Sequence, residues 1–128
     1  MKSTVKGIIY GVILLAVLYS SQFLHVGTAA SDAFPPIAVS KWQAVFLGGG
    51  QVYFGRLADV GNGYVTLSDV YYLKSASELE QSNLNLVKLG GELHGPEDTI
   101  YIRKESISFW ENMKDTSRVV QSIQSAKQ

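Results

Sequence analysis

From Trp42 onward the sequence is divided into short runs of β-forming residues that end at glycine. The runs are rich in Val, Tyr, Phe and Ile, and Gly48-Gly49-Gly50 and Gly61-Asn62-Gly63 separate the first three of them. Glycine adopts positive φ at little cost, so these positions predict tight turns between antiparallel strands. Short strands joined in this way leave room only for a small, bent sheet. We therefore predict a mainly β domain over residues 41–113.

Two details refine this prediction. Gly55 stands in the middle of the second run, which indicates a bulge or a sharp bend of the strand. In the last pair of runs, alternation places Ile102 and Phe109 on the inner face and Tyr101 and Trp110 on the outer face. Strands this short and this bent predict a small five-stranded antiparallel barrel.

Two segments resemble the motifs of the Sm family. VFLGGGQVYFGRLADVGNGYVTL is similar to the first Sm motif, with its Gly-containing turn, a V-x-x-G-x-L strand and a loop that bears Asp and Asn. IYIRKESISFW is similar to the second motif, an I-x-R turn that leads into the last strand. The resemblance covers residues 42–112 and implies an Sm-like or SH3-like barrel. For Sm proteins that bind RNA, it implies a site at Asp59, Asn62 and Arg103.

This implied site has a competing interpretation. Asp59 and Asn62 lie closer to Gly55 than in the Sm pattern, and Lys104 stands where Gly commonly follows the arginine. Turn formation explains Asp and Asn equally well, and a surface ion pair with a nearby carboxylate explains Arg103. The whole chain also resembles a set of uncharacterised single-pass membrane proteins of candidate-phylum bacteria, in QAVFLGGGQVYFGRL, LVKLGGELHGPED and SFWENM. That likeness implies no activity.

Before the β domain lies an apolar stretch, Gly7–Val26, of 20 residues. A helix of that length spans the hydrocarbon core of a bilayer. Two lysines precede it and the next charge is Asp32, which predicts a signal-anchor helix with residues 1–6 in the cytoplasm and the domain outside. Residues 27–40 are then a Pro-containing linker. The alternative is a signal peptide cleaved near Thr28-Ala29-Ala30, with secretion of the domain.

Charge and cysteine content exclude several classes of protein. Residues 41–113 hold six Lys/Arg and nine Asp/Glu, a net charge of −3. An acidic domain repels phosphate backbones, so the charge predicts against nucleic acid as a partner. The chain has no cysteine, which excludes disulfides, thiol catalysis and thiolate metal sites.

Outside the implied RNA site, the candidate functional residues are aromatic and acidic. The candidate interaction surface consists of Tyr71, Tyr72, Tyr101, Trp110, Glu92 and His94. The competing interpretation is that the aromatic rings only cover the barrel from outside. Glu92 and His94 match no recognised ligand or catalytic spacing, so we predict no catalytic residue, metal or cofactor. A metal-dependent or hydrolytic site at these two residues is the weakest alternative.

The leading prediction is therefore a membrane-anchored, non-enzymatic extracytoplasmic binding or assembly module. Its partner would be a protein or the cell surface, and its edge strands would allow a homo-oligomer. The alternative is an Sm-like nucleic-acid-binding protein with its barrel in the cytoplasm. Residues 114–128 form a tail that can start a helix at Asp115 or Thr116, with a narrow apolar stripe at Val119, Val120 and Ile123.

Overall fold

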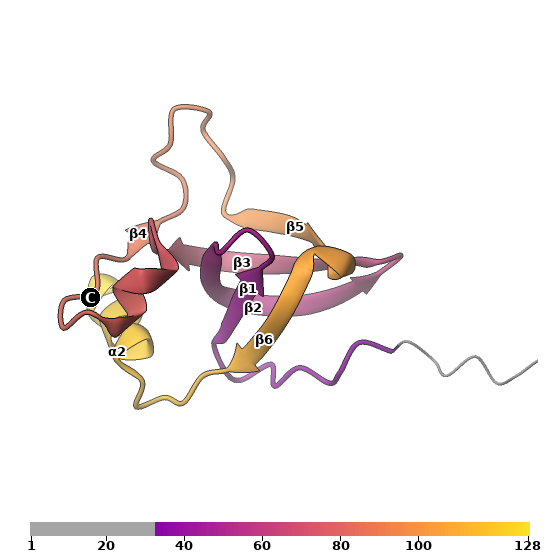
Figure 1. The fold of residues 1–128 in the computed structure, drawn as a ribbon, viewed down its shortest axis with the longest axis horizontal. Helices are drawn as coiled ribbons and strands as arrows, with labels where there is room; N and C mark the ends of the chain where they lie inside the picture. The colour runs from indigo at the N-terminus through magenta and orange to yellow at the C-terminus, as the bar shows by residue number, and fades with distance from the viewer. Residues whose placement is uncertain (1–32) are drawn as a thin grey trace, which may run out of the picture. The chain divides into compact units, whose positions relative to one another are not determined.

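The computed structural model describes residues 33–128, of which Pro35–Gln128 form one compact unit. Its elements in chain order are β1 (Gln43–Leu47), β2 (Val52–Gly61), β3 (Tyr64–Tyr72), the 3₁₀ helix η1 (Ala76–Glu80), β4 (Val87–Lys88), β5 (Thr99–Arg103), the 3₁₀ helix η2 (Lys104–Ser106), β6 (Ile107–Asn112) and α2 (Arg118–Ala126). The prediction of a mainly β domain with a C-terminal helix is confirmed (Figure 1). The predicted span Gly7–Val26 lies outside the described residues.

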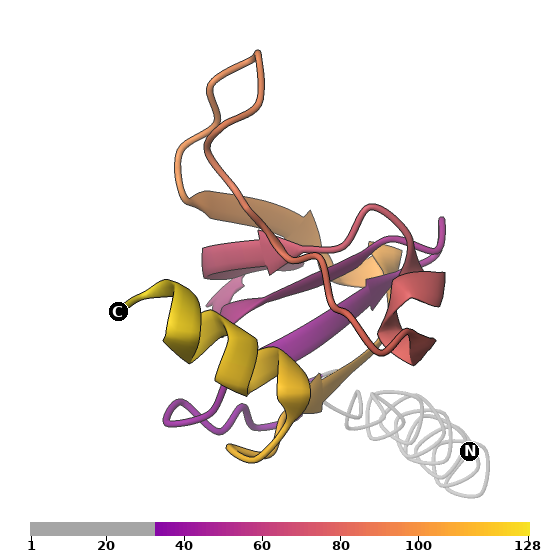
Figure 2. The same cartoon turned by 90° about the vertical axis from the view of Figure 1, so that its left-hand side faces the viewer.

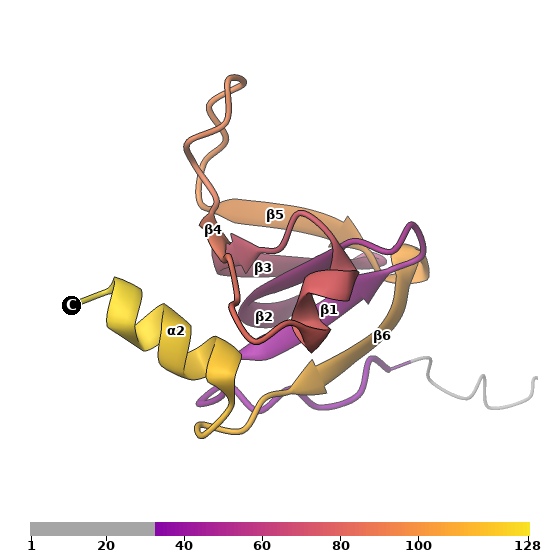
Figure 3. The same ribbon diagram turned by 60° about the vertical axis from the view of Figure 1, so that its left-hand side comes forward.

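All strands belong to one antiparallel sheet in the order β4-β3-β2-β1-β6, with β5 paired to β3. The first half of β3 pairs with β5, and its last two residues pair with β4. The chain passes from β5 to β6 through η2, and no ladder within residues 33–128 joins these two strands. The sheet therefore curls into a barrel with an open seam, and β5 and β6 lie at its margins (Figure 3).

The sheet has six strands where five were predicted. The strand β4 has only two residues. In the run LNLVKL, only Val87 and Lys88 pair with β3. The chain between β4 and β5 leaves the sheet and projects as a long loop (Figure 1).

A bulge at Gly55 bends β2. The register between β2 and β3 shifts between Phe54 and Arg56, which confirms the predicted irregularity at this glycine. A Cβ at Gly55 would lie 2.6 Å from the carbonyl oxygen of Ser68 and 2.9 Å from Cγ of Leu67. Glycine is therefore required here because the neighbouring backbone leaves no room for a side chain.

The strand β6 departs from its predicted alternation. Phe109, predicted to face inward, is 51% exposed and stacks on Phe46 with ring centroids 4.2 Å apart. The reason is an irregularity in the ladder with β1, where Phe46 pairs with Phe109 but Leu47 pairs with Ile107. The intervening Ser108 is left out of the pairing, so the alternation reverses across it.

Gln43 is the buried polar side chain of the core. Its Nε2 donates to the carbonyl oxygen of Ala38 at 2.8 Å and to Oδ1 of Asn112 at 2.9 Å. Its Oε1 accepts from the backbone N–H of Leu57 at 3.0 Å. One amide thus joins β1 to β2, to the end of β6 and to the segment before β1, with all its contacts satisfied.

Helix α2 lies across one end of the barrel (Figure 2). It begins after Ser117, whose Oγ accepts a hydrogen bond from the N–H of Val120 at 3.1 Å. The start is later than the predicted Asp115 or Thr116 because Ser117 is the residue that caps the helix. The buried residues of the helix are those of the predicted stripe, Val119, Val120 and Ile123.

Candidate functional site

Two hollows lie at opposite ends of β2, β3 and β5. The first, here called the hairpin pocket, has a volume of about 320 Å³ and lies where the β2–β3 turn meets the β5–η2 turn. Its lining residues are Asn62, Gly63, Tyr64, Arg103, Lys104 and Glu105. The second, here called the loop pocket, has a volume of about 530 Å³ and lies under the loop between β4 and β5.

Backbone pairing brings the two turns of the hairpin pocket together. Tyr64 and Arg103 are partners in the β3–β5 ladder, and the N–H of Lys104 donates to the carbonyl oxygen of Gly63 at 2.8 Å. The turn itself depends on positive φ at Asn62 and at the glycines on either side of it. As a result the Arg103 Nε donates to the hydroxyl of Tyr64 at 3.4 Å.

The charges of the hairpin pocket are balanced in the free protein. The guanidinium of Arg103 forms an ion pair with Glu105 at 2.9 Å, and the ammonium group of Lys104 forms one with Asp59, also at 2.9 Å. The Arg103 side chain is 63% exposed. The hydrogen bond from Lys104 and that from the N–H of Gly61 hold the pKa of Asp59 below its usual value.

The structure brings two of the three residues of the implied RNA site into this pocket. Asn62 and Arg103 line it, whereas Asp59 lies beside it and is held by Lys104 and by the turn. The structure agrees with the competing interpretations as well, because Asp59 accepts a hydrogen bond within the turn and Arg103 forms an ion pair with Glu105. The sequence interpretation missed Tyr64, whose position beside Arg103 depends on strand register.

The loop pocket is lined by Tyr53, Tyr72, Leu89, Glu92, His94, Pro96, Thr99, Ile100 and Tyr101. Four of the six residues of the candidate interaction surface therefore meet here. The other two do not: Tyr71 is 5% exposed and packs edge-on against Trp42 in the core. Trp110 is half-buried on β6 and pairs in the ladder with the buried Val45. Strand register, rather than aromatic character, decides which rings face the pocket.

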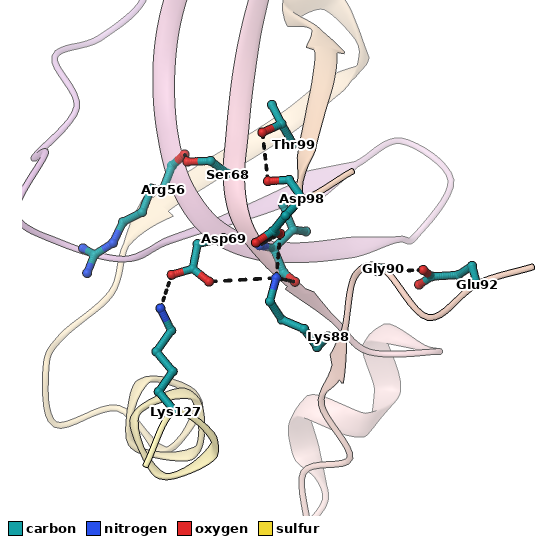
Figure 4. Close-up of polar contacts among 10 residues, drawn as sticks. Arg56, Ser68, Asp69, Lys88, Gly90, Glu92, Asp98, Thr99 and Lys127 are labelled. Atoms are coloured by element: carbon teal, nitrogen blue, oxygen red, sulfur yellow. Dashed lines mark hydrogen bonds and ion pairs between the residues drawn. The ribbon is translucent and has the colours of Figure 1, made fainter. Parts of the chain in front are cut away.

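The loop of residues 89–98 is closed at its base by Lys88 and Asp98. The Lys88 Nζ lies 2.5 Å from Oδ1 of Asp98, and the same oxygen accepts from the N–H of Val70 at 2.8 Å. Asp69 also forms ion pairs with Lys88 and with Lys127 of the C-terminal segment (Figure 4). Burial raises the pKa of Asp98, but the hydrogen bonds from Lys88 and Val70 outweigh it, so the pKa lies below the usual value.

Glu92 organises the tip of the loop. Its Oε1 accepts from the hydroxyl of Tyr72 at 2.6 Å and its Oε2 from the N–H of Gly90 at 2.8 Å. Its carbonyl oxygen accepts from the N–H of Gly95 at 2.9 Å. The hydrogen bond from Tyr72 holds the pKa of Glu92 below its usual value and raises the pKa of Tyr72. The Glu92 side chain is therefore a fixed, ionised carboxylate at neutral pH.

Within residues 33–128, no three His, Cys, Asp or Glu side chains gather in a group that could hold a metal ion. The described residues therefore offer no group of side chains that would support a metal-dependent or hydrolytic site at Glu92 and His94. The Glu92 carboxylate is already used by Tyr72 and Gly90.

No protein-family model matches this chain, and no curated protein matches it. Among solved structures, it is similar to a heptameric archaeal Sm protein, with 17% identity over 59% of this chain and 90% of that one and a TM-score of 0.41. It is also similar to a Pyrococcus abyssii Sm protein in complex with a uridine heptamer, with 20% identity over 59% of this chain and 86% of that one and a TM-score of 0.36.

These findings correct the leading functional prediction. The leading prediction of a membrane-anchored extracytoplasmic module finds no support in these comparisons and is withdrawn, and the alternative prediction is taken up as a proposal below. The predicted location, a single pass through the cell membrane with the domain outside, is withdrawn with it. No helix in the described part of the chain, residues 33–128, has the length and apolar character that a membrane span needs. The predicted anchor, Gly7–Val26, lies outside the described residues. The likeness to single-pass bacterial proteins stays a prediction.

The prediction against nucleic acid rested on net charge, and that argument is incomplete. The net charge of −3 is a sum over the whole of residues 41–113. Recognition depends on the local field, and Arg103 and Lys104 stand next to each other at one turn. A domain of negative net charge can therefore still present cations at one pocket.

Proposed function

We propose that the protein is an Sm-like, non-enzymatic nucleic-acid-binding protein that binds single-stranded RNA at the hairpin pocket. One observation carries the proposal: the β3–β5 ladder sets the Arg103 side chain beside the hydroxyl of Tyr64 at an exposed hollow lined by Asn62. Guanidinium groups pair with phosphate or with base edges, aromatic rings stack on unpaired bases, and an amide hydrogen-bonds to a base.

The ion pair between Arg103 and Glu105 does not prevent binding. Both side chains are mostly exposed, and ion pairs of this kind stabilise a protein by only about 0–1 kcal/mol. A phosphate group can replace the Glu105 carboxylate as the partner of Arg103 at small cost. The fork of the guanidinium also matches phosphate oxygens better than an ammonium group does.

The backbone at this end of the barrel gives a nucleotide room to approach. A Cβ at Gly61 or Gly63 would have no atom within 4 Å, so both glycines border open space. Their positive φ values of 75° and 78° explain why side chains are absent at these two positions. Asn62, between them, is exposed and has its amide available at the rim.

We further propose that copies of the chain associate through the margins of the open seam. In the part of the chain that the structure describes, the outer edges of β5 and β6 pair with no strand, and such edges are templates for another chain. An assembly would place several weak hairpin pockets on one RNA, which raises the effective affinity. Native mass spectrometry of the full chain tests this, and a monomer at all concentrations contradicts it.

The RNA proposal is tested by fluorescence anisotropy with the full chain and a labelled heptamer of uridine. We expect Arg103→Ala to weaken binding about tenfold, because one guanidinium contact is lost. Arg118→Ala is the matched control, since it removes the same charge from α2, outside the lining of the hairpin pocket. Arg103→Lys should restore the charge but only part of the affinity.

Two results contradict the proposal. The first is that the unaltered chain shows no salt-dependent binding of the RNA, because phosphate contacts require such dependence. The second is that Arg118→Ala weakens binding as much as Arg103→Ala does. Thermal unfolding of each variant separates a lost contact from a lost fold.

A further inference from the structure

The loop pocket combines aromatic rings with a single negative charge. Its lining includes three tyrosines and one carboxylate and contains neither Lys nor Arg. The rings of Tyr53 and Tyr72 have centroids 5.9 Å apart and an interplanar angle of 54°, so they present two faces set at an angle to each other. Tyr101, which is 72% exposed, adds a third ring from β5.

The negative charge is held in place before any ligand arrives. Both oxygens of Glu92 accept hydrogen bonds, one from Tyr72 and one from the backbone of Gly90. The base of the loop is closed by the ion pair of Lys88 with Asp98. The carboxylate is thus connected directly to one of the rings and cannot move away from the pocket without breaking these contacts.

We propose that the loop pocket binds an organic cation with an alkylated ammonium group. The faces of aromatic rings carry negative potential and attract cations, and alkylated ammonium groups lose little hydration when they enter such a pocket. Glu92 supplies the opposite charge. Leu89, Pro96 and Ile100 supply apolar contacts for the alkyl groups.

The same features exclude other classes of ligand. A phosphate or carboxylate group is repelled by Glu92, which no cation of the lining neutralises. A divalent metal ion needs several oxygen or nitrogen ligands, and the lining offers only Glu92 and His94 as titratable ligands of that kind. The volume of about 530 Å³ lies within the range of small-molecule pockets.

The test measures binding of tetramethylammonium and of choline to the full chain. Their neutral isostere, 3,3-dimethylbutan-1-ol, has the same shape as choline but no charge, and sodium chloride at equal ionic strength controls for salt. A maltoside detergent is used, because Gly7–Val26 is apolar and detergents with choline head groups would compete. Tyrosine ring NMR signals and calorimetry report binding. We expect saturable binding of both cations and at least about fivefold weaker binding of the isostere.

Variants assign the binding to the pocket. We expect Glu92→Gln to weaken choline binding about fivefold, and Tyr101→Leu about two- to fivefold, while Tyr101→Phe keeps the ring and the affinity. Phe109→Leu is the matched control, since it removes an exposed ring from β6, which does not line this pocket.

The proposal is overturned if neither cation shifts the tyrosine signals more than sodium chloride does, or if the isostere binds as tightly as choline. It is also overturned if Phe109→Leu causes the same loss as Tyr101→Leu. None of these measurements involves RNA, so a failure of the RNA proposal leaves them valid. Thermal unfolding again confirms that each variant is folded.

Discussion

The hairpin pocket and the loop pocket are built on the same three strands but differ in their charged groups. Each places a tyrosine at its wall, Tyr64 at one end and Tyr72 at the other. The hairpin pocket has two cations whose partners are carboxylates, whereas the loop pocket has one carboxylate and no cation. The aromatic ring is therefore the common element, and the sign of the neighbouring charge decides which ligand each end can hold.

The two pockets also differ in how firmly the charge is held. Arg103 pairs with another exposed side chain, which a ligand can replace. Glu92 accepts hydrogen bonds from a hydroxyl and a backbone N–H that are themselves fixed by the fold. The exchangeable ion pair of Arg103 suits a flexible polymer such as RNA. The fixed carboxylate of Glu92 suits a small ligand, because a small ligand gains too little binding free energy to offset the entropy cost of ordering the site.

The largest expected effect comes from the bulge of β2 at Gly55. Gly55→Ala should lower the free energy of unfolding by about 1–3 kcal/mol, because its Cβ would collide with the backbone of Ser68. Both binding activities should weaken together. Gly49→Ala is the control, since a Cβ there meets no atom within 4 Å. Urea unfolding measures the difference, and equal midpoints for the two variants would show that the bulge tolerates a side chain.

A second change should affect the loop pocket alone. Asp98→Ala removes the acceptor of the Val70 N–H and the partner of Lys88. Loss of such a hydrogen bond costs about 1–2 kcal/mol locally, so the amide of Val70 should exchange its hydrogen about tenfold faster. Choline binding should fall and RNA binding should stay constant. Hydrogen exchange by NMR measures this, with Glu97→Ala, at the neighbouring exposed position, as the control.

A third change should strengthen the hairpin pocket. Glu105→Gln removes the carboxylate that pairs with Arg103, so the guanidinium is free for phosphate. We expect RNA affinity to rise about two- to fivefold, the equivalent of one exposed ion pair. Glu111→Gln makes the same change of net charge on β6, which does not line the hairpin pocket. An equal rise in both variants would mean that only the total charge matters.

The smallest expected effect concerns pH. Glu92 has a pKa below the ordinary value of 4.5, and Asp98 one below 3.8, so both remain ionised as the pH falls from 7 to 5. Choline affinity should therefore stay constant over that interval. The support that Asp98 gives to the fold is fully present above its unfolded pKa and is lost only as the pH falls through the lower folded value. Calorimetry across this range checks it, and a loss of choline affinity between pH 7 and 5 would contradict it.

The sequence predicted those features that depend on neighbouring residues. The bend at Gly55 and the apolar stripe of the helix follow from local patterns, and the structure has both. Residues that meet across strands were not predictable in this way. Tyr64 and Arg103 are 39 positions apart and become neighbours only through the register of β3 and β5.

The predictions that failed did so for physical reasons of two kinds. The irregular pairing at Ser108 reverses the faces of β6, and no residue type marks it in the sequence. Tyr71 was predicted as part of the interaction surface, but it lies in the core. The functional prediction summed charge over the domain, whereas Arg103 and Lys104 lie next to each other at a single turn.

The position of α2 in chain order has a consequence for synthesis. Val120 and Ile123 complete the same core cluster that contains Trp42, just before β1, and Phe54 of β2. A nascent chain that has emerged from the ribosome as far as β6 but not α2 would therefore have a barrel whose apolar end is still open to solvent. Such an end is a binding site for chaperones. The domain should become resistant to proteases only after the ribosome has released enough chain for the helix to dock.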